Sequence, residues 1–411
     1  MLCHEPVGGI RCLHDCLGDR MFTPRSASAQ TYTVLHDFSG GPGGAIPYAG
    51  LVMDRAGNLY GTTSSGGEQN CGDPILRNWC GTVFELTASG QFQLLWQFTG
   101  NPDGGDPEGE LLLGPGGMLY GSTTVGGPGG DGTIFSLSPS PTPPRNIQER
   151  WIKTIVYSFA GNSDGALPNG PLVMDHAGNL YGSTYAGGSG GNDGTVFELR
   201  PSNGRWNETI LHRFDDNDGK NPDDGVTLDA VGNIYGTTRG GGRFDSGVVY
   251  QLLAGSAWQE NVLYDFASGG FDPQSGVTLD AAGNLFGSTF GGGGNGAGTA
   301  FELSSGSWTQ QVIYNFSGAH AWGPDFSKLI FDAAGNLYGT TNGDGLYGAG
   351  SVFRLTPSNG AWIYTSLHDF TGGSDGGYPV GTLVLDANGN LYGTTSYGGH
   401  NTVGVVFKIT P

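Results

Sequence analysis

The chain has 411 residues, 79 of them glycine, and Asp and Glu outnumber Lys and Arg by 37 to 17, for a formal net charge of −20. Glycine does not recur at every third position and aromatic residues make up 11% of the chain, so the composition excludes fibrous and disordered proteins. An acidic surface repels phosphate, which excludes nucleic acid and anionic membranes as partners, and no apolar run is long enough to span a membrane. The composition predicts an all-β fold of short strands and tight turns.

Residues 1–30 are expected to be a non-globular N-terminal segment ahead of the fold, which takes residues 31–411. Ala27-Ser28-Ala29 is similar to a signal-peptidase site, although Arg11, Asp15, Asp19 and Arg20 stand where a signal would be apolar. We therefore interpret the segment as a degenerate or mis-started signal region and expect an exported protein, extracellular or periplasmic.

Cys71 and Cys80 bracket a long loop near the start of the fold and are the only cysteine pair after residue 30. Such a pair in an exported protein predicts a disulfide between Cys71 and Cys80. Two free thiols in a cytosolic protein are the alternative.

One motif recurs seven times, as an aromatic residue between Leu or Ile and Gly, at intervals of 51 to 61 residues. The period suits a four-stranded propeller blade with strands A to D. The aromatic residues are Tyr60, Tyr120, Tyr181, Tyr235, Phe286, Tyr338 and Tyr392.

Strand A of each unit follows a proline and ends, in six units, in Asp-x-x-Gly-Asn; the second unit has Gly114 instead of the aspartate. We expect the carboxylate to cap the turn to strand B rather than to bind calcium. The prolines are Pro47, Pro107, Pro168, Pro222, Pro273, Pro324 and Pro379. The turn aspartates are Asp54, Asp175, Asp229, Asp280, Asp332 and Asp386.

The other three strands also have fixed signatures. A glycine inside strand B, such as Gly61, predicts the close approach of another backbone. Strand C carries a buried aromatic such as Phe84, and strand D has a tryptophan near its start in five units, such as Trp258.

The two ends of the chain are complementary. Residues 32–38 read as a strand D without its own A, B and C, and the last unit stops after strand C. The fold class is therefore predicted as a seven-bladed β-propeller with four antiparallel strands per blade, its ring closed by the N-terminal strand completing the last blade.

The units resemble the GloVer tandem repeat of exported bacterial proteins, whose hallmark Gly-Asn-Leu-Tyr-Gly-Thr-Thr is found at 57–63 and again at 389–395. The resemblance extends over about residues 31–411. It implies export and often surface anchoring, and it implies no particular activity.

In a propeller the A–B and C–D turns share one face, which we call the turn face, and the D–A and B–C loops share the other, the loop face. Loop lengths vary on the loop face, where binding sites are usually built. The residue after each strand A proline should ring the mouth of the central channel there. Five of these carry side-chain oxygen and predict a calcium site, with a solvated channel mouth as the alternative. They are Glu108, Asn169, Asp223, Gln274 and Asp325.

No nucleophile with a nearby base and no cofactor fingerprint is readable in the sequence. The favoured interpretation is a non-catalytic extracellular or cell-surface binding protein, a monomer with a glycan or protein ligand on the loop face. The alternative is a propeller hydrolase or lyase, similar to lactonases, with a divalent cation at the channel mouth.

Overall fold

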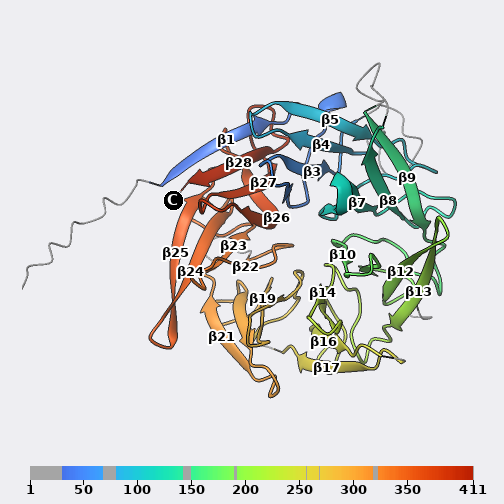
Figure 1. The fold of residues 1–411 in the computed structure, drawn as a ribbon. Helices are drawn as coiled ribbons and strands as arrows, with labels where there is room; N and C mark the ends of the chain where they lie inside the picture. Colours follow the sequence, from blue (N-terminus) through green and yellow to red (C-terminus); the bar gives the residue numbers. More distant parts are fainter. Residues whose placement is uncertain are drawn as a thin grey trace, which may run out of the picture.

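The computed structural model of the chain describes residues 30–67, 80–141, 150–188, 192–255, 257–267, 269–317 and 323–410. Within these ranges seven sheets, each of four antiparallel strands, surround one central axis (Figure 1). The predicted seven-bladed β-propeller is confirmed. No helix in the described part of the chain has the length and apolar character needed to cross a membrane.

The first four blades follow one another along the chain. Blade 1 consists of β2 (Val52–Met53), β3 (Leu59–Thr63), β4 (Thr82–Leu86) and β5 (Phe92–Gln97), and blade 2 of β6 (Leu112–Leu113), β7 (Leu119–Thr123), β8 (Thr133–Pro139) and β9 (Trp151–Ser158). Blade 3 consists of β10 (Val173–Met174), β11 (Leu180–Thr184), β12 (Thr195–Ser202) and β13 (Arg205–Arg213), and blade 4 of β14 (Thr227–Leu228), β15 (Ile234–Thr238), β16 (Val248–Leu252) and β17 (Glu260–Asp265).

The last three blades complete the ring. Blade 5 consists of β18 (Thr278–Leu279), β19 (Leu285–Thr289), β20 (Thr299–Leu303) and β21 (Gln310–Asn315), and blade 6 of β22 (Ile330–Phe331), β23 (Leu337–Thr341), β24 (Ser351–Ser358) and β25 (Ala361–Asp369). Blade 7 consists of β26 (Gly377–Leu385), β27 (Leu391–Tyr397), β28 (Val405–Thr410) and β1 (Thr31–Asp37). Two short 3-10 turns, η1 (Gly41–Gly43) and η2 (Pro115–Gly117), lie between strands.

Ring closure takes place in blade 7. The N-terminal strand β1 runs antiparallel to β28, with Tyr32 opposite Ile409 and Val34 opposite Phe407. In Figure 1 the first and last strands of the chain lie side by side at the outer edge of this blade. The outer edge of the last C-terminal strand is thereby paired, as predicted.

Aromatic pairs join each blade to the next. The strand C aromatic is fully buried in all seven blades, and its ring meets a phenylalanine that follows strand D of the preceding blade, with ring centroids 5.1 to 5.3 Å apart. Burial of one such side chain stabilises the fold by about 2–3 kcal/mol. The pairs are Phe38–Phe84, Phe98–Phe135, Phe159–Phe197, Phe214–Tyr250, Phe266–Phe301, Phe316–Phe353 and Phe370–Phe407.

The strand B glycine makes room for this aromatic ring. A Cβ atom on Gly61 would lie 2.6 Å from Cζ of Phe84 and 2.8 Å from Cδ2 of Leu51. The approach that excludes a side chain is therefore that of two side chains, not of the backbone that the sequence predicted. Phe84 is the residue that pairs with Gly61 across strands B and C of the same blade.

The turn aspartates hold the A–B hairpins. Oδ1 of Asp54 accepts hydrogen bonds from the backbone N–H groups of Ala56 and Asn58, both at 2.9 Å, and Oδ2 accepts from Asn58 Nδ2 at 2.9 Å and from the Tyr60 hydroxyl at 3.2 Å. The two backbone bonds recur at the other five aspartates. Each carboxylate is thus saturated within its own turn.

Two predictions fall outside the described residues. Residues 1–29 and Cys71 are not among them, so the non-globular N-terminal segment and the disulfide between Cys71 and Cys80 stay predictions. Cys80 itself is fully buried in the core between blades 1 and 2.

Candidate functional site

The strand A prolines lead directly into the central channel on the loop face. In six blades the residue before the proline has a positive φ, between 52° and 59°, and its N–H donates to a carbonyl in the B–C loop of the preceding blade. These residues are Ile46, Asp106, Leu167, Asn221, Asp272 and Tyr378. A left-handed conformation is costly for residues other than glycine, so the bond between blades holds each strand entry in place. The side chains that follow therefore project from a rigid rim.

Three of the predicted ligands meet in one small cavity inside this rim. Glu108, Asn169 and Asp223 line a space of about 30 Å³, together with Tyr48 and Phe326. Asn169 Nδ2 donates to Asp223 Oδ1 at 2.6 Å. A volume of this size suits a single ion or water molecule.

The other two predicted ligands are placed differently. Asp325 is close enough to Tyr48, which lines the cavity, for its charge to raise the pKa of the Tyr48 hydroxyl. Its Oδ2 accepts a hydrogen bond from Asn342 Nδ2 at 3.2 Å. Gln274 is 3% exposed and donates through Nε2 to Asp272 Oδ2 at 2.9 Å, and it does not line the cavity. The shared register brings three of the five residues into the cavity and Asp325 near it, and it turns Gln274 toward its own loop.

Two buried oxygen atoms at the site have no hydrogen-bond partner. They are Oδ1 of Asn169 and Oδ1 of Asp325. A buried acceptor without a donor costs about 1–3 kcal/mol, so both atoms would be stabilised by a cation or a polar ligand. The residues present fit a cation in this respect. Among the described residues, however, no three His, Cys, Asp or Glu side chains are grouped closely enough to hold an ion by themselves, so the amide oxygen of Asn169 is a necessary part of any such site.

The site raises the pKa of each of its carboxyl groups. Burial, with the charges of Asp106 and Asp223, raises the pKa of Glu108 to about 8. Burial and then the charge of Asp223 raise the pKa of Asp325 to about 7. Burial also raises the pKa of Asp223, to about 6, against the opposing charge of Arg239. Carboxyl groups that titrate near neutral pH are typical of sites that move protons or bind cations.

A second layer of polar side chains was not predicted from the sequence, and its members Glu110 and Asp224 line the same cavity. Glu110 Oε1 accepts from the Thr382 N–H at 2.5 Å, Asp224 accepts from the N–H groups of Gly225 and Gly276, and Lys328 Nζ donates to Thr227 Oγ1 at 2.6 Å. Burial lowers the pKa of Lys328, against the charges of Asp224 and Glu110. Side chains two apart on a strand point to the same side, and this relation between Glu108 and Glu110 could have revealed the layer.

One arginine completes the rim. Arg239 Nε lies 3.0 Å from Asp272 Oδ1, and its Nη1 lies 3.5 Å from Asp223 Oδ2. Arg239 follows strand B, and a lone arginine in a variable loop gave no signal in the sequence. Its charge offsets part of the repulsion among the channel carboxylates.

Solved structures that are similar to this chain are β-propellers described as enzymes. A putative oxidoreductase (glucose dehydrogenase) of Thermus thermophilus shares 16% identity over 92% of this chain and 99% of its own, with a TM-score of 0.45. A gluconolactonase of Xanthomonas campestris shares 12% over 93% and 89%, with a TM-score of 0.42. A luciferin-regenerating enzyme shares 12% over 72% and 87%, with a TM-score of 0.40. No curated protein matches the sequence.

These comparisons correct one prediction. They contradict the favoured interpretation as a non-catalytic binding protein, because the similar structures are described as enzymes. They agree better with the alternative of a propeller hydrolase. At such low identity the likeness itself shows only the fold.

The sequence also matches a family model over almost its whole length. The model of the Gloeobacter/Verrucomicrobia repeat matches residues 22–236, 76–280 and 227–411 in three overlapping stretches. These stretches include all seven copies of the aromatic-glycine motif. The chain belongs to the Gloeobacter/Verrucomicrobia repeat family.

Proposed function

We propose that this protein is a hydrolase that depends on a divalent cation and opens small lactones or esters at the loop-face mouth of its channel. The observation that supports this is the convergence of Glu108, Asn169 and Asp223 on one ion-sized cavity, beside two buried oxygen atoms without partners.

Glu108, Asn169 and Asp223 are the residues that would hold the cation. Carboxylate and amide oxygens are hard donors, which favour calcium or magnesium over softer metals. A bound cation would polarise the carbonyl oxygen of a substrate. Because Glu108 keeps its proton up to about pH 8 without the cation, cation binding should release protons and tighten as the pH rises.

Asp325 is the candidate general base. Its pKa of about 7 suits proton transfer at neutral pH. Asn342 donates to Oδ2 and so orients the carboxyl group, while Oδ1 remains available to take a proton from water. Arg239, on the same rim, would balance negative charge that develops as the ester is attacked.

Thermal unfolding with added calcium tests the cation site. Saturation at 100 times the Kd should stabilise the fold by about 2.7 kcal/mol, and the double variant Glu108→Gln with Asp223→Asn should remove this gain. Glu208→Gln is the matched control, because burial also raises the pKa of Glu208 but its strand β13 lies on the outside of blade 3. A melting temperature independent of calcium and magnesium would reject the cation site.

Hydrolysis of a panel of small lactones and esters tests the reaction. We expect turnover that a chelator abolishes, and Asp325→Asn should lower kcat about 10²–10⁴-fold while keeping the calcium effect on melting. Loss of both effects in Asp325→Asn would assign Asp325 to cation binding instead. Absence of turnover across the panel, with and without added cation, would reject the hydrolase.

Export, the disulfide and the monomeric state belong to the same proposal. A protein that works outside the cell would be stabilised by a bond between Cys71 and Cys80, which stand in the sequence between strands B and C of the first blade. Thiol labelling of the unfolded, unreduced protein should leave both cysteines unmodified. Labelling of either one would reject the disulfide. Light scattering measures the oligomeric state, which we expect to be monomeric.

A further inference from the structure

One position in each blade can be identified by strand register. It lies two residues before the strand D residue that pairs with the last Leu or Ile of strand C. In blade 4, for example, Leu252 pairs with Glu260 and the position is Trp258. From blade 1 to blade 7 the residues at this position are Gly90, Trp151, Trp206, Trp258, Trp308, Trp362 and Gln30.

The five tryptophans seal the seams between blades. Each packs against the strand B aromatic of the preceding blade, with ring centroids 6.1 to 6.5 Å apart. The aromatic partners under these tryptophans are 4–8% exposed. They are Tyr60, Tyr120, Tyr181, Tyr235 and Phe286. A tryptophan at this position thus covers one strand B ring from solvent.

The seam between blades 7 and 1 has no such cover. Here the position is Gly90, and a Cβ atom on Gly90 would find no other atom within 4 Å. Tyr392 is the corresponding strand B aromatic, and it is only half-buried, whereas the six others are buried. A cavity of about 880 Å³ opens at this seam on the turn face and is lined by both residues.

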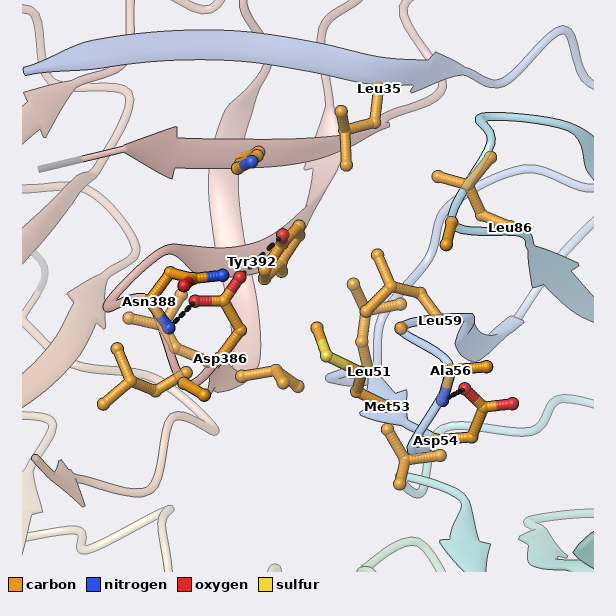
Figure 2. Close-up of a pocket in the computed structure, with 18 of the residues that line it drawn as sticks. Leu35, Leu51, Met53, Asp54, Ala56, Leu59, Leu86, Asp386, Asn388 and Tyr392 are labelled. Carbon is orange, nitrogen blue, oxygen red and sulfur yellow. Dashed lines mark hydrogen bonds between the residues drawn. The ribbon is translucent and has the colours of Figure 1, made fainter.

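The walls of the cavity differ in chemistry. Figure 2 shows Tyr392, Asp386 and Asn388 on one side and Leu51, Leu59 and Leu86 on the other. The carboxylate of Asp386 is occupied, because it accepts bonds from its own turn and from the Tyr392 hydroxyl.

The unpaired charge in the cavity is positive. Lys408 lines the cavity, with Nζ 5.6 Å from the centre of the Tyr392 ring. None of the ion pairs between described residues includes Lys408 or Arg55, which also lines the cavity. The cavity therefore offers a flat aromatic surface, an aliphatic wall, one ammonium group and one guanidinium group.

From these features we infer that the seam cavity is a binding site for a small planar aromatic acid. Its ring would occupy the space that an indole side chain fills at five other seams, over Tyr392, and its carboxylate would accept a hydrogen bond from Lys408 Nζ. The site lies on the turn face, opposite the channel mouth, and is independent of the proposed hydrolase.

Calorimetric titration with indole-3-acetate as the probe tests the inference. The parent protein should bind it saturably with a Kd below about 1 mM, the affinity that a ligand of this size reaches at ordinary efficiency. Lys408→Gln should weaken this binding about ten-fold and leave binding of neutral indole unchanged. Absence of saturable binding of the acid to the parent protein would overturn the proposal.

Gly90→Trp is the second variant, since it places the missing ring in the cavity. Gly90 has a φ of 84°, and Trp258 and Trp308 also have positive φ angles at this position, 44° and 50°. Burial of the new ring over Tyr392 should offset the strain of a non-glycine residue here, about 1–2 kcal/mol, so the variant should stay folded and should lose binding of both probes. Gly204→Trp is the matched control, since Gly204 also has a positive φ and open space around it but lies in blade 3, where Trp206 already fills the position. Unchanged binding by a folded Gly90→Trp protein would overturn the location of the site.

Discussion

The two faces of the ring use carboxylates in opposite ways. On the turn face, partial burial alone would raise the pKa of Asp54, but hydrogen bonds from Asn58, Ala56 and Tyr60 outweigh it and hold the pKa below its ordinary value. On the loop face, burial and neighbouring charge raise the pKa values of Glu108, Asp223 and Asp325. A carboxylate that the fold satisfies is structural, and one that it leaves short of donors is available for chemistry.

The seams on the turn face should give the largest effect. Trp258→Ala removes a half-buried ring that covers Tyr181 and should destabilise the fold by about 2–4 kcal/mol. Gln30→Ala, at the same position in blade 7, where the side chain is exposed, should change the stability little. Chemical unfolding measures both. An equal loss of unfolding free energy in the two variants would mean that the tryptophan does not stabilise the seam.

Loss of a turn carboxylate should come next. Asp54→Ala removes four hydrogen bonds at once and should cost about 2–3 kcal/mol. Asp54→Asn keeps an acceptor for the backbone N–H groups and should cost less. If Asp54→Ala unfolds at the same denaturant concentration as the parent, the A–B turns do not need their carboxylates for stability.

The pH dependence of stability should separate the faces by sign. Because the folded-state pKa values of Asp54, Asp175, Asp332 and Asp386 are lowered, these groups stabilise the fold above their unfolded pKa of about 4, and that stability is lost as the pH falls further. Melting temperatures from pH 6 to pH 3 should fall less steeply in Asp54→Asn than in the parent. Parallel curves would contradict this origin of acid sensitivity.

The channel carboxylates should give an effect of the opposite sign. The pKa of Glu108 rises from about 4.3 in the unfolded chain to about 8, so its contribution is present at low pH and is lost as the pH rises between these values. Glu108→Gln should therefore raise the melting temperature at pH 8, in the absence of cations, by several degrees, and should not raise it at pH 4. A lower melting temperature at pH 8 would assign Glu108 to structure.

The strand pattern and ring closure were predictable because they depend on local chemistry. Asp-x-x-Gly-Asn makes the same hairpin wherever it occurs, and the unmatched strand at 32–38 had one place to pair. The strand A register also placed Glu108, Asn169 and Asp223 at the channel. The orientation of Gln274 was not predictable, because its amide donates a hydrogen bond to Asp272, and strand register does not specify this contact.

The sequence by itself therefore determined the number of blades, the order of their strands and the turn carboxylates, since each follows from residues within one repeat. Only the tertiary structure decided which side chains face one another across repeats: the layer of Glu110, Asp224 and Lys328, the contacts of Arg239 and the open seam between Tyr392 and Gly90. These depend on how seven wedge-shaped sheets close around one axis. Closure joins residues from opposite ends of the chain, and no local pattern encodes their distance.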